Sequence, residues 1–402
     1  QFSLRDRLFL TAALRADDNS AFGDEFSLVY YPKASATWVI TEEPFWNFDR
    51  ISSLRLRGAY GQAGQQPGAF DALRTYNPVP GPKDVGTVTP GTVGNPNLGP
   101  ERSSEFELGF DAGFMDDRVG LEFTWFNQTT RDAILLRPVA PSMGFPGSRF
   151  INLGEIQNQG YEMILSATPV STPRVKWDAT LSLANITNEV KYISDEEDAI
   201  VVNSAFGVEH RVGYPLGAWF HRRVVSAEFN DDGQVIRSSM QCDNGTGGTT
   251  ACYDGSTPVA PRVYLGTSEP KYEGAFTSTV MLGERIRIYG MVDFKTGFRK
   301  WDHVTRVRCS LNNICHENVA PLDYVETAPA RLASYQNADQ FGAAYINNSS
   351  FMKLREISVS YMVPAEWAQR IGASRASISM AGRNLHTWTK WTGMDPEARF
   401  LG

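Results

Sequence analysis

Apolar and polar side chains alternate along residues 105–136, on both sides of one tight turn at 115–118. Because successive side chains of a strand point to opposite faces, this alternation predicts an antiparallel hairpin with one apolar and one polar face. Its strands run about ten residues or more, as in the wall of an outer-membrane barrel. Aromatic rings crowd the apolar positions, which are Phe106, Leu108, Phe110, Ala112, Phe114, Leu121, Phe123 and Trp125.

The length of 402 residues suits either two or three soluble domains or one large barrel. No stretch of about 18 uncharged apolar residues occurs, so the sequence predicts no transmembrane helix. A barrel leaves no such stretch, because polar lumen residues interrupt every strand. The net charge of −7 gives no indication of a nucleic-acid partner.

Similar alternation recurs along the chain and predicts eleven strands of an all-β, antiparallel, up-and-down barrel. Residues 364–373 are expected to form one or two helical turns, and 230–233 (NDDG) to turn an internal hairpin. The expected strands are at about 2–16, 27–41, 54–62, 102–114, 118–137, 150–168, 174–190, 270–281, 285–295, 344–363 and 374–390.

Short and long connections alternate between these strands, which is typical of a membrane meander with tight periplasmic turns and large external loops. The two longest connections, 191–268 and 299–342, are expected to be extracellular loop regions. On this count the first and the eleventh strand run in the same direction, so an even-stranded barrel needs at least one more strand. An open sheet edge is not stable in lipid, because its unpaired backbone N–H and C=O groups find no hydrogen-bond partners there. We therefore expect residues 1–402 to be part of a longer protein.

The four cysteines form two close pairs in loop-like sequence. Three pairings are possible in principle, and we expect the local disulfides Cys242–Cys252 and Cys309–Cys315, which imply an oxidising compartment. The spacing is not that of a zinc site, and the five histidines are scattered. We therefore expect no metal ion, no other cofactor and no enzymatic activity.

Five sequence runs resemble a known family. Residues 94–101 (GNPNLGPE) are similar to a signature of TonB-dependent outer-membrane receptors, and residues 152–162 (NLGEIQNQGYE) resemble a strand of the SusC/RagA transporters. Three further runs, 213–220, 345–358 and 382–397, also resemble that group and follow in family order. One departure is the run 242–248 (CDNGTGG), which replaces an acidic loop that the family often carries.

The resemblance implies the C-terminal half of a plugged barrel of about 22 strands in the bacterial outer membrane. It implies energy-coupled import of an oligosaccharide or peptide, driven by the TonB complex through an N-terminal region absent here, with a SusD-like surface lipoprotein as partner. Two alternatives remain open: a passive porin-like channel, and a soluble or surface β-protein that binds glycans.

Candidate site residues fall into three groups. Aromatic residues in the 299–342 region could contact ligand, or instead pack the loop or meet a lid protein: Trp301, His303, Tyr324 and Tyr335. Charged residues on polar strand faces are expected to face the lumen or plug: Glu162, Arg285, Arg287, Asp293 and Lys295. Apolar residues of the hairpin are expected to face lipid: Phe106, Leu108, Phe110, Phe123 and Trp125.

Two motifs have a structural interpretation as well as a functional one. The run 154–162 is more simply explained as a structural strand segment than as a ligand site, because its glycines allow close backbone approach. Asp231 and Asp232 could ligate calcium, but the remaining ligands of an EF-hand are missing, so a hairpin turn is the simpler interpretation.

Overall fold

The computed structural model describes residues 1–18, 28–145, 147–194 and 198–398. The chain divides into two compact units, which are described separately. We call residues 1–198, 272–294 and 352–387 the wall unit, and residues 199–271, 295–351 and 388–402 the loop unit. Within the described residues, no helix has both the length and the apolar character needed to cross a membrane.

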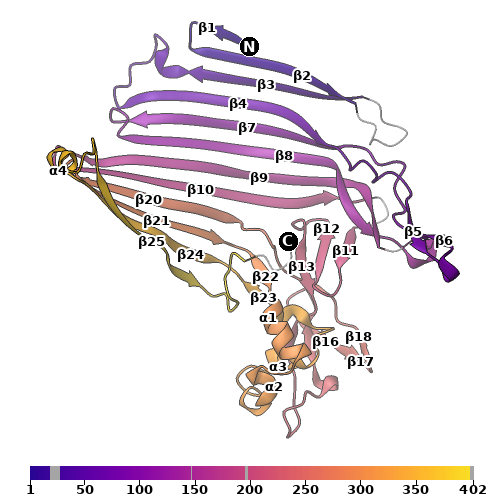
Figure 1. The fold of residues 1–402 in the computed structure, drawn as a ribbon. Helices are drawn as coiled ribbons and strands as arrows, with labels where there is room; N and C mark the ends of the chain where they lie inside the picture. Colours follow the sequence, from indigo (N-terminus) through magenta and orange to yellow (C-terminus); the bar gives the residue numbers. More distant parts are fainter. Residues whose placement is uncertain (19–27, 146, 195–197, 399–402) are drawn as a thin grey trace. The chain divides into compact units, whose positions relative to one another are not determined.

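The main sheet has twelve strands that lie side by side in one curved layer (Figure 1). The order along the sheet is the order along the chain, interrupted only by shorter strands that belong elsewhere, so the sheet is a meander. Its strands are β1 (Phe2–Leu4), β2 (Leu8–Asp17), β3 (Val29–Val39), β4 (Ile51–Gln65), β7 (Glu101–Phe114), β8 (Val119–Pro138), β9 (Ser148–Ser171), β10 (Val175–Tyr192), β20 (Tyr272–Leu282), β21 (Ile286–Thr296), β24 (Phe351–Met362) and β25 (Ser377–Thr389).

The predicted all-β antiparallel fold is confirmed, with two corrections to the strands. The expected strand 2–16 is in fact β1 and β2, because Arg5 and Asp6 adopt positive φ values of 50° and 54° and turn the chain back on itself. The count is therefore twelve strands rather than eleven. The expected strand 344–363 is also two, β23 (Ile346–Asn348) and β24, because β23 pairs with β22 (Arg299–Trp301) in a separate small sheet.

Short connections alternate with long ones, as the sequence predicts. The hairpin of β7 and β8 turns through three consecutive residues with positive φ, Met115, Asp116 and Asp117. Helix α4 (Ala365–Arg370) forms the expected helical turns between β24 and β25. One long connection also holds a small hairpin that the sequence analysis missed, β5 (Tyr76–Pro80) and β6 (Gly86–Pro90). The first residue of the expected strand 27–41 lies outside the described residues.

The apolar rings of the β7–β8 hairpin share one face of the sheet. Phe110 stacks on Phe123 at 5.7 Å between ring centroids, and Phe106 meets Trp125 edge-on at 6.3 Å. Leu108 lies directly opposite Trp125 in the strand register, so it belongs to the same face. The five expected lipid-facing residues therefore form one continuous apolar surface, and its contact with lipid remains a prediction.

The opposite face carries a chain of polar side chains across four neighbouring strands. Asn188 donates a hydrogen bond to Asn158 (2.5 Å), Asn158 donates to Gln128 (3.2 Å), and Gln128 donates to Glu105 (2.8 Å). Glu162 shares this face, because it is four residues from Asn158 on β9. One face of the sheet is thus apolar and the other polar, as is typical of a barrel wall with lipid outside and water inside.

The expected lumen residues of the strand 285–295 fall in and beside β21. Asp293 accepts a hydrogen bond from Arg355 of β24 (2.8 Å). The Arg287 guanidinium lies 5.7 Å from the ring centroid of Tyr289. Lys295 lies near the end of β21, and Arg285 lies in the turn before the strand, where its carbonyl accepts from the Met362 amide (2.7 Å). Whether these residues meet a plug remains a prediction.

Two of the family-like runs contact each other through Asn152. Its side chain accepts from the Gly99 amide (2.7 Å) and donates to the Gly99 carbonyl (2.9 Å) and to the Asp132 carbonyl (2.8 Å). Gly154 has φ +45°, and a Cβ there would lie 1.8 Å from the Tyr192 carbonyl oxygen. A Cβ at Gly160 would lie 1.9 Å from the carbonyl oxygen of Asn185. These contacts support a structural role for the run 154–162.

The loop unit is built from small sheets and short helices. The turn expected at 230–233 is confirmed: Phe229 bridges to Val235, and the Asn230 side chain accepts from the amides of Asp232 (3.1 Å) and Gln234 (2.8 Å). The region 299–342, expected as a loop, contains three helices. The elements are β11 (Ala199–Asn203), β12 (Val208–Arg211), β13 (Ala218–His221), β19 (Val263–Gly266), β14 (Val224–Ser226), β15 (Gln241–Asp243), β16 (Thr249–Ala251), β17 (Tyr253–Asp254), β18 (Thr257–Pro258), β22, β23, α1 (His303–Arg306), α2 (His316–Val319) and α3 (Pro329–Gln336).

We predict that Asn152→Asp destabilises the wall unit, because the carboxylate keeps the acceptor but loses both amide donors and faces two carbonyl oxygens. The free energy of unfolding should fall by roughly 1–3 kcal/mol. Denaturant titration of the full-length protein in detergent measures this change. Asn97→Asp, in the neighbouring run, is the matched control and should change little; equal effects of the two substitutions would contradict the assigned role.

Candidate functional site

The first disulfide lies at the centre of one hydrophobic core of the loop unit. Cys242 and Cys252 are bonded, as predicted, and both are fully buried. The core around them includes Met240 and, from much later in the chain, Ala333 and Phe341. The segments 199–271 and 295–351 therefore pack against each other around this disulfide.

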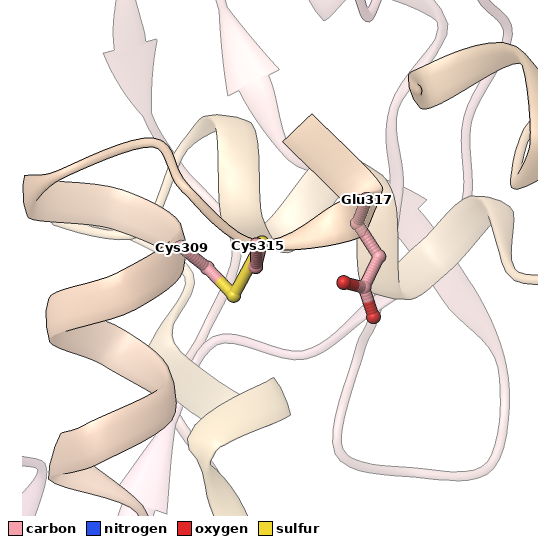
Figure 2. Close-up of side chains that lie close together, drawn as sticks. All are labelled: Cys309, Cys315 and Glu317. Carbon is pink, nitrogen blue, oxygen red and sulfur yellow. A yellow bond between two sulfur atoms is a disulfide. The ribbon is translucent and has the colours of Figure 1, made fainter. Parts of the chain in front are cut away.

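The second predicted disulfide, Cys309–Cys315, closes a short ring between α1 and α2 (Figure 2). It packs with Tyr335 and Tyr345, whose rings stack at 5.0 Å. The Tyr345 hydroxyl shares a hydrogen bond with Ser310, and burial raises the pKa of Tyr345 to about 12. The loop from Cys309 to Cys315 is thus held both by its disulfide and by packing against two buried tyrosine side chains.

Glu317 is close enough to this disulfide to form a possible three-residue metal group with the two cysteines. Figure 2 shows, however, that the two sulfur atoms are bonded to each other. Disulfide sulfurs are not thiolates and do not serve as metal ligands in the usual way. The Glu317 carboxylate instead meets the Arg331 guanidinium at 3.5 Å. This cluster is therefore structural.

Gln336, at the end of α3, joins the two segments of the loop unit by hydrogen bonds. Its side-chain oxygen accepts from the Val235 amide (2.8 Å), and its side-chain nitrogen donates to the Gly233 carbonyl (2.9 Å). The Tyr253 hydroxyl adds a third link by donating to Asn337 (3.3 Å). These bonds hold the 234–258 region beside the 310–340 region.

A polar cavity of about 640 Å³ lies between these two regions of the loop unit. That volume is within the usual range for small-molecule sites. Amide, hydroxyl and aromatic side chains dominate its lining. The lining residues are Gln234, Arg237, Tyr253, Ser256, Pro258, Ser310, Leu311, Asn313, Asn318, Tyr335, Gln336, Asn337, Ala338, Asp339 and Gln340. The cavity is the candidate ligand site of the described structure.

The amino-acid profile of the family described as TonB dependent receptor-like, beta-barrel matches residues 1–314. The chain belongs to this family. The named relatives are receptors rather than enzymes, and the family predicted from the sequence runs is confirmed.

Relatives of known name cover nearly the whole chain. A TonB-dependent receptor of Formosa agariphila is 24% identical over an alignment of 436 positions, gaps included, that covers 100% of this chain and 42% of that protein. The TonB-dependent receptor SusC of Bacteroides thetaiotaomicron is 23% identical over an alignment of 421 positions, gaps included, that covers 99% of this chain and 40% of SusC. The chain thus spans about two fifths of the length of these curated relatives.

Solved structures of the RagAB peptide transporter share the fold of this TonB-dependent receptor chain. One matches with a TM-score of 0.78 at 19% identity, over 97% of this chain and 43% of that chain. The 'open-open' state of the RagAB peptide importer matches with a TM-score of 0.79 at 19% identity, over 99% and 43%. The twelve-stranded sheet is therefore part of a receptor barrel.

The four aromatic residues predicted to contact ligand have different surroundings in the receptor. Tyr335 lines the cavity but is only 7% exposed, because its ring stacks on Tyr345. Trp301 is half-buried among Phe206 and Tyr345, and His303 lies edge-on to Phe206. Trp301 and His303 thus take part in packing the loop, which was the alternative considered from the sequence.

Tyr324, the fourth of these residues, is half-buried between His316 and Arg331. Among the four, Tyr335 alone belongs to the cavity lining. Sequence reasoning missed Arg237 and the lining amides, because the two regions that supply the lining are at least 52 residues apart in the chain, from Pro258 to Ser310. The only sequence signal near them was the pair of local disulfides.

His221 is the most deeply buried histidine of the loop unit, at 2% exposure. Its Nδ1 accepts from the backbone amides of Arg222 (3.0 Å) and Gly342 (3.0 Å), so that atom cannot carry a proton without losing both bonds. Burial, helped by the positive charges of Arg262 and Arg222, lowers the pKa of His221 to about 4. The imidazole therefore stays neutral at ordinary pH and links the two segments.

We predict that the loop unit loses stability as the pH falls from about 6.5 to about 4. The unfolded chain binds a proton at His221 near pH 6.5, whereas the folded chain resists it until about pH 4. The free energy of unfolding should therefore fall by about 3 kcal/mol between these two pH values. Hydrogen exchange at the Gly342 amide, measured at several pH values, reports the change.

His221→Asn keeps an acceptor for the two amides but does not titrate, so it should flatten this pH dependence. His316→Asn is the control, because His316 is exposed and lies against Tyr324. An unaltered pH profile in the His221→Asn protein would contradict the assignment.

Proposed function

We propose that the protein takes part in TonB-dependent import of a nutrient, an oligosaccharide or a peptide, across the bacterial outer membrane. The observation that carries the proposal is the meander of long two-faced strands in a chain that belongs to the receptor barrel family. Aromatic and aliphatic side chains cover one face, and an amide chain crosses the other. Such a wall separates lipid from an aqueous lumen.

In this proposal the long connections, including 191–268 and 299–342, face the cell exterior and the short turns face the periplasm. The polar cavity of the loop unit then receives ligand from outside. The TonB complex supplies energy through a region of the full-length receptor outside this chain, and a SusD-like surface lipoprotein is its partner. Support for the partners comes from the similarity to SusC and to the RagAB fold.

The mechanism needs no covalent chemistry by the described residues. Hydrogen-bonding side chains of the loop unit hold the ligand, and the wall provides a water-filled path for it. Charged lumen residues such as Glu162 and Arg287 then contact the plug or the moving ligand. Import against a gradient requires work from the TonB complex, which distinguishes this function from passive diffusion.

We predict that uptake depends on TonB. A strain that lacks the full-length gene should lose growth on at least one glycan or peptide of a defined nutrient panel. Deleting the TonB gene in the parent strain, whose receptor gene is intact, should abolish growth on the same nutrient. Uptake that persists without TonB would instead favour a passive channel, and a product found in the soluble fraction would favour a soluble glycan-binding protein.

We also predict that Leu108→Arg and Phe123→Arg impair membrane insertion. A charged side chain on the lipid face costs about 2–4 kcal/mol at mid-membrane depth. Heat-modifiable gel migration of the outer-membrane fraction measures folded protein. Glu122→Arg is the control, because Glu122 lies next to Phe123 on β8 but on the opposite face of the sheet, and this variant should assemble normally. Normal assembly of all three variants would count against lipid contact.

A further inference from the structure

Arg237 brings a positive charge to the cavity of the loop unit. Its guanidinium lies over the Tyr253 ring, 5.8 Å from guanidinium carbon to ring centroid. No carboxylate in the described part of the chain forms an ion pair with it. An exposed guanidinium held on an aromatic ring has its hydrogen-bond donors available for a ligand.

The other charged residue of the lining does not neutralise this charge. Asp339 is bound to the Arg306 guanidinium at 3.0 Å, and its side chain is 84% exposed. Its negative charge is thus already compensated within the loop unit. Of the two charged residues in the lining, Arg237 is therefore the one without an ion-pair partner in the described part of the chain.

The remaining lining favours a ligand rich in hydroxyl groups. Gln234, Gln340 and Ser256 line the cavity with exposed groups that can both donate and accept hydrogen bonds. A hydroxyl group also does both, so these side chains suit it.

We propose that this cavity binds an acidic saccharide, a sugar unit that carries a carboxylate or a sulfate. Arg237 pairs with the anionic group, because a guanidinium binds planar or tetrahedral oxyanions through two parallel hydrogen bonds. The exposed amides of the lining bind the hydroxyls. This inference rests on the proposed import function and specifies its ligand.

A peptide fits the same cavity less well. Peptide recognition through side chains needs apolar pockets, and the aliphatic lining here is limited to Pro258, Leu311 and Ala338. The positive charge of Arg237 and the exposed groups of Gln234, Gln340 and Ser256 together favour the acidic sugar.

Calorimetry on the purified full-length receptor in detergent tests the proposal. The probes are trigalacturonic acid, a sulfated galactose trisaccharide, neutral galactotriose and a triglutamate peptide. Either acidic trisaccharide should bind about tenfold or more tightly than galactotriose, and its affinity should fall as salt is raised. The two acidic probes distinguish a carboxylate ligand from a sulfate ligand.

Three variants locate the effect. Arg237→Gln should weaken the acidic trisaccharide about tenfold or more and leave galactotriose unchanged. Gln340→Glu, nearly isosteric, should also weaken it by adding a negative charge to the lining. Arg308→Gln is the control, because Arg308 is exposed and lies beside the lining without belonging to it. If Arg237→Gln does not fold, Gln340→Glu decides the outcome.

The proposal is overturned if no saccharide binds, if galactotriose binds as tightly as the acidic probes, or if the peptide binds more tightly than either. It is also overturned if both cavity variants leave the affinity unchanged. TonB-dependent uptake with no preference for charge would refute this inference alone. Selective binding without TonB-dependent uptake would refute the import function and leave the ligand assignment standing.

Discussion

The structure of the wall depends on the pairing of backbone amides and carbonyls between neighbouring strands. A chain in lipid has no water to satisfy these groups, so each strand must find partners along its length. The strand registers show this over long stretches: β8 pairs with β9 from Val119 to Pro138, and β9 pairs with β10 over most of its length. The strand register determines which side chains share a face of the sheet, and so it separates the apolar face from the polar one.

Much of the wall could be predicted from the sequence because its signal is local. Alternation with period two, together with turn residues, locates each strand within a few positions, as for the hairpin of β7 and β8. This pattern gave a wrong strand where apolar residues keep to every second position across a turn. Leu4, Leu8 and Leu10 all occupy even positions, so the pattern reads as one unbroken strand although the chain turns at Arg5 and Asp6. The turn brings Leu4 opposite Leu8, so their side chains still share one face of the sheet.

The loop unit was predicted less well, because its structure depends on contacts between distant segments. Both disulfides are local and could be read from spacing, whereas the helices α1, α2 and α3 are short and lie in sequence rich in loop-forming residues. The cavity needs Arg237 and Asn318 in one place, and no periodic pattern links them. Tyr335 was found for its aromatic character, although much of its ring serves the packing around Cys309 and Cys315.

Each disulfide joins two cysteines of the same segment, and no cysteine bond crosses from 199–271 to 295–351. The strands β20 and β21 separate these segments in the chain, so the segments form a common core only through non-covalent contacts such as those of Phe341 and Gln336. We therefore expect a core substitution in one segment to need a compensating substitution in the other. A recombination event that replaced one segment alone would exchange half of a shared hydrophobic core for a half that does not match the other.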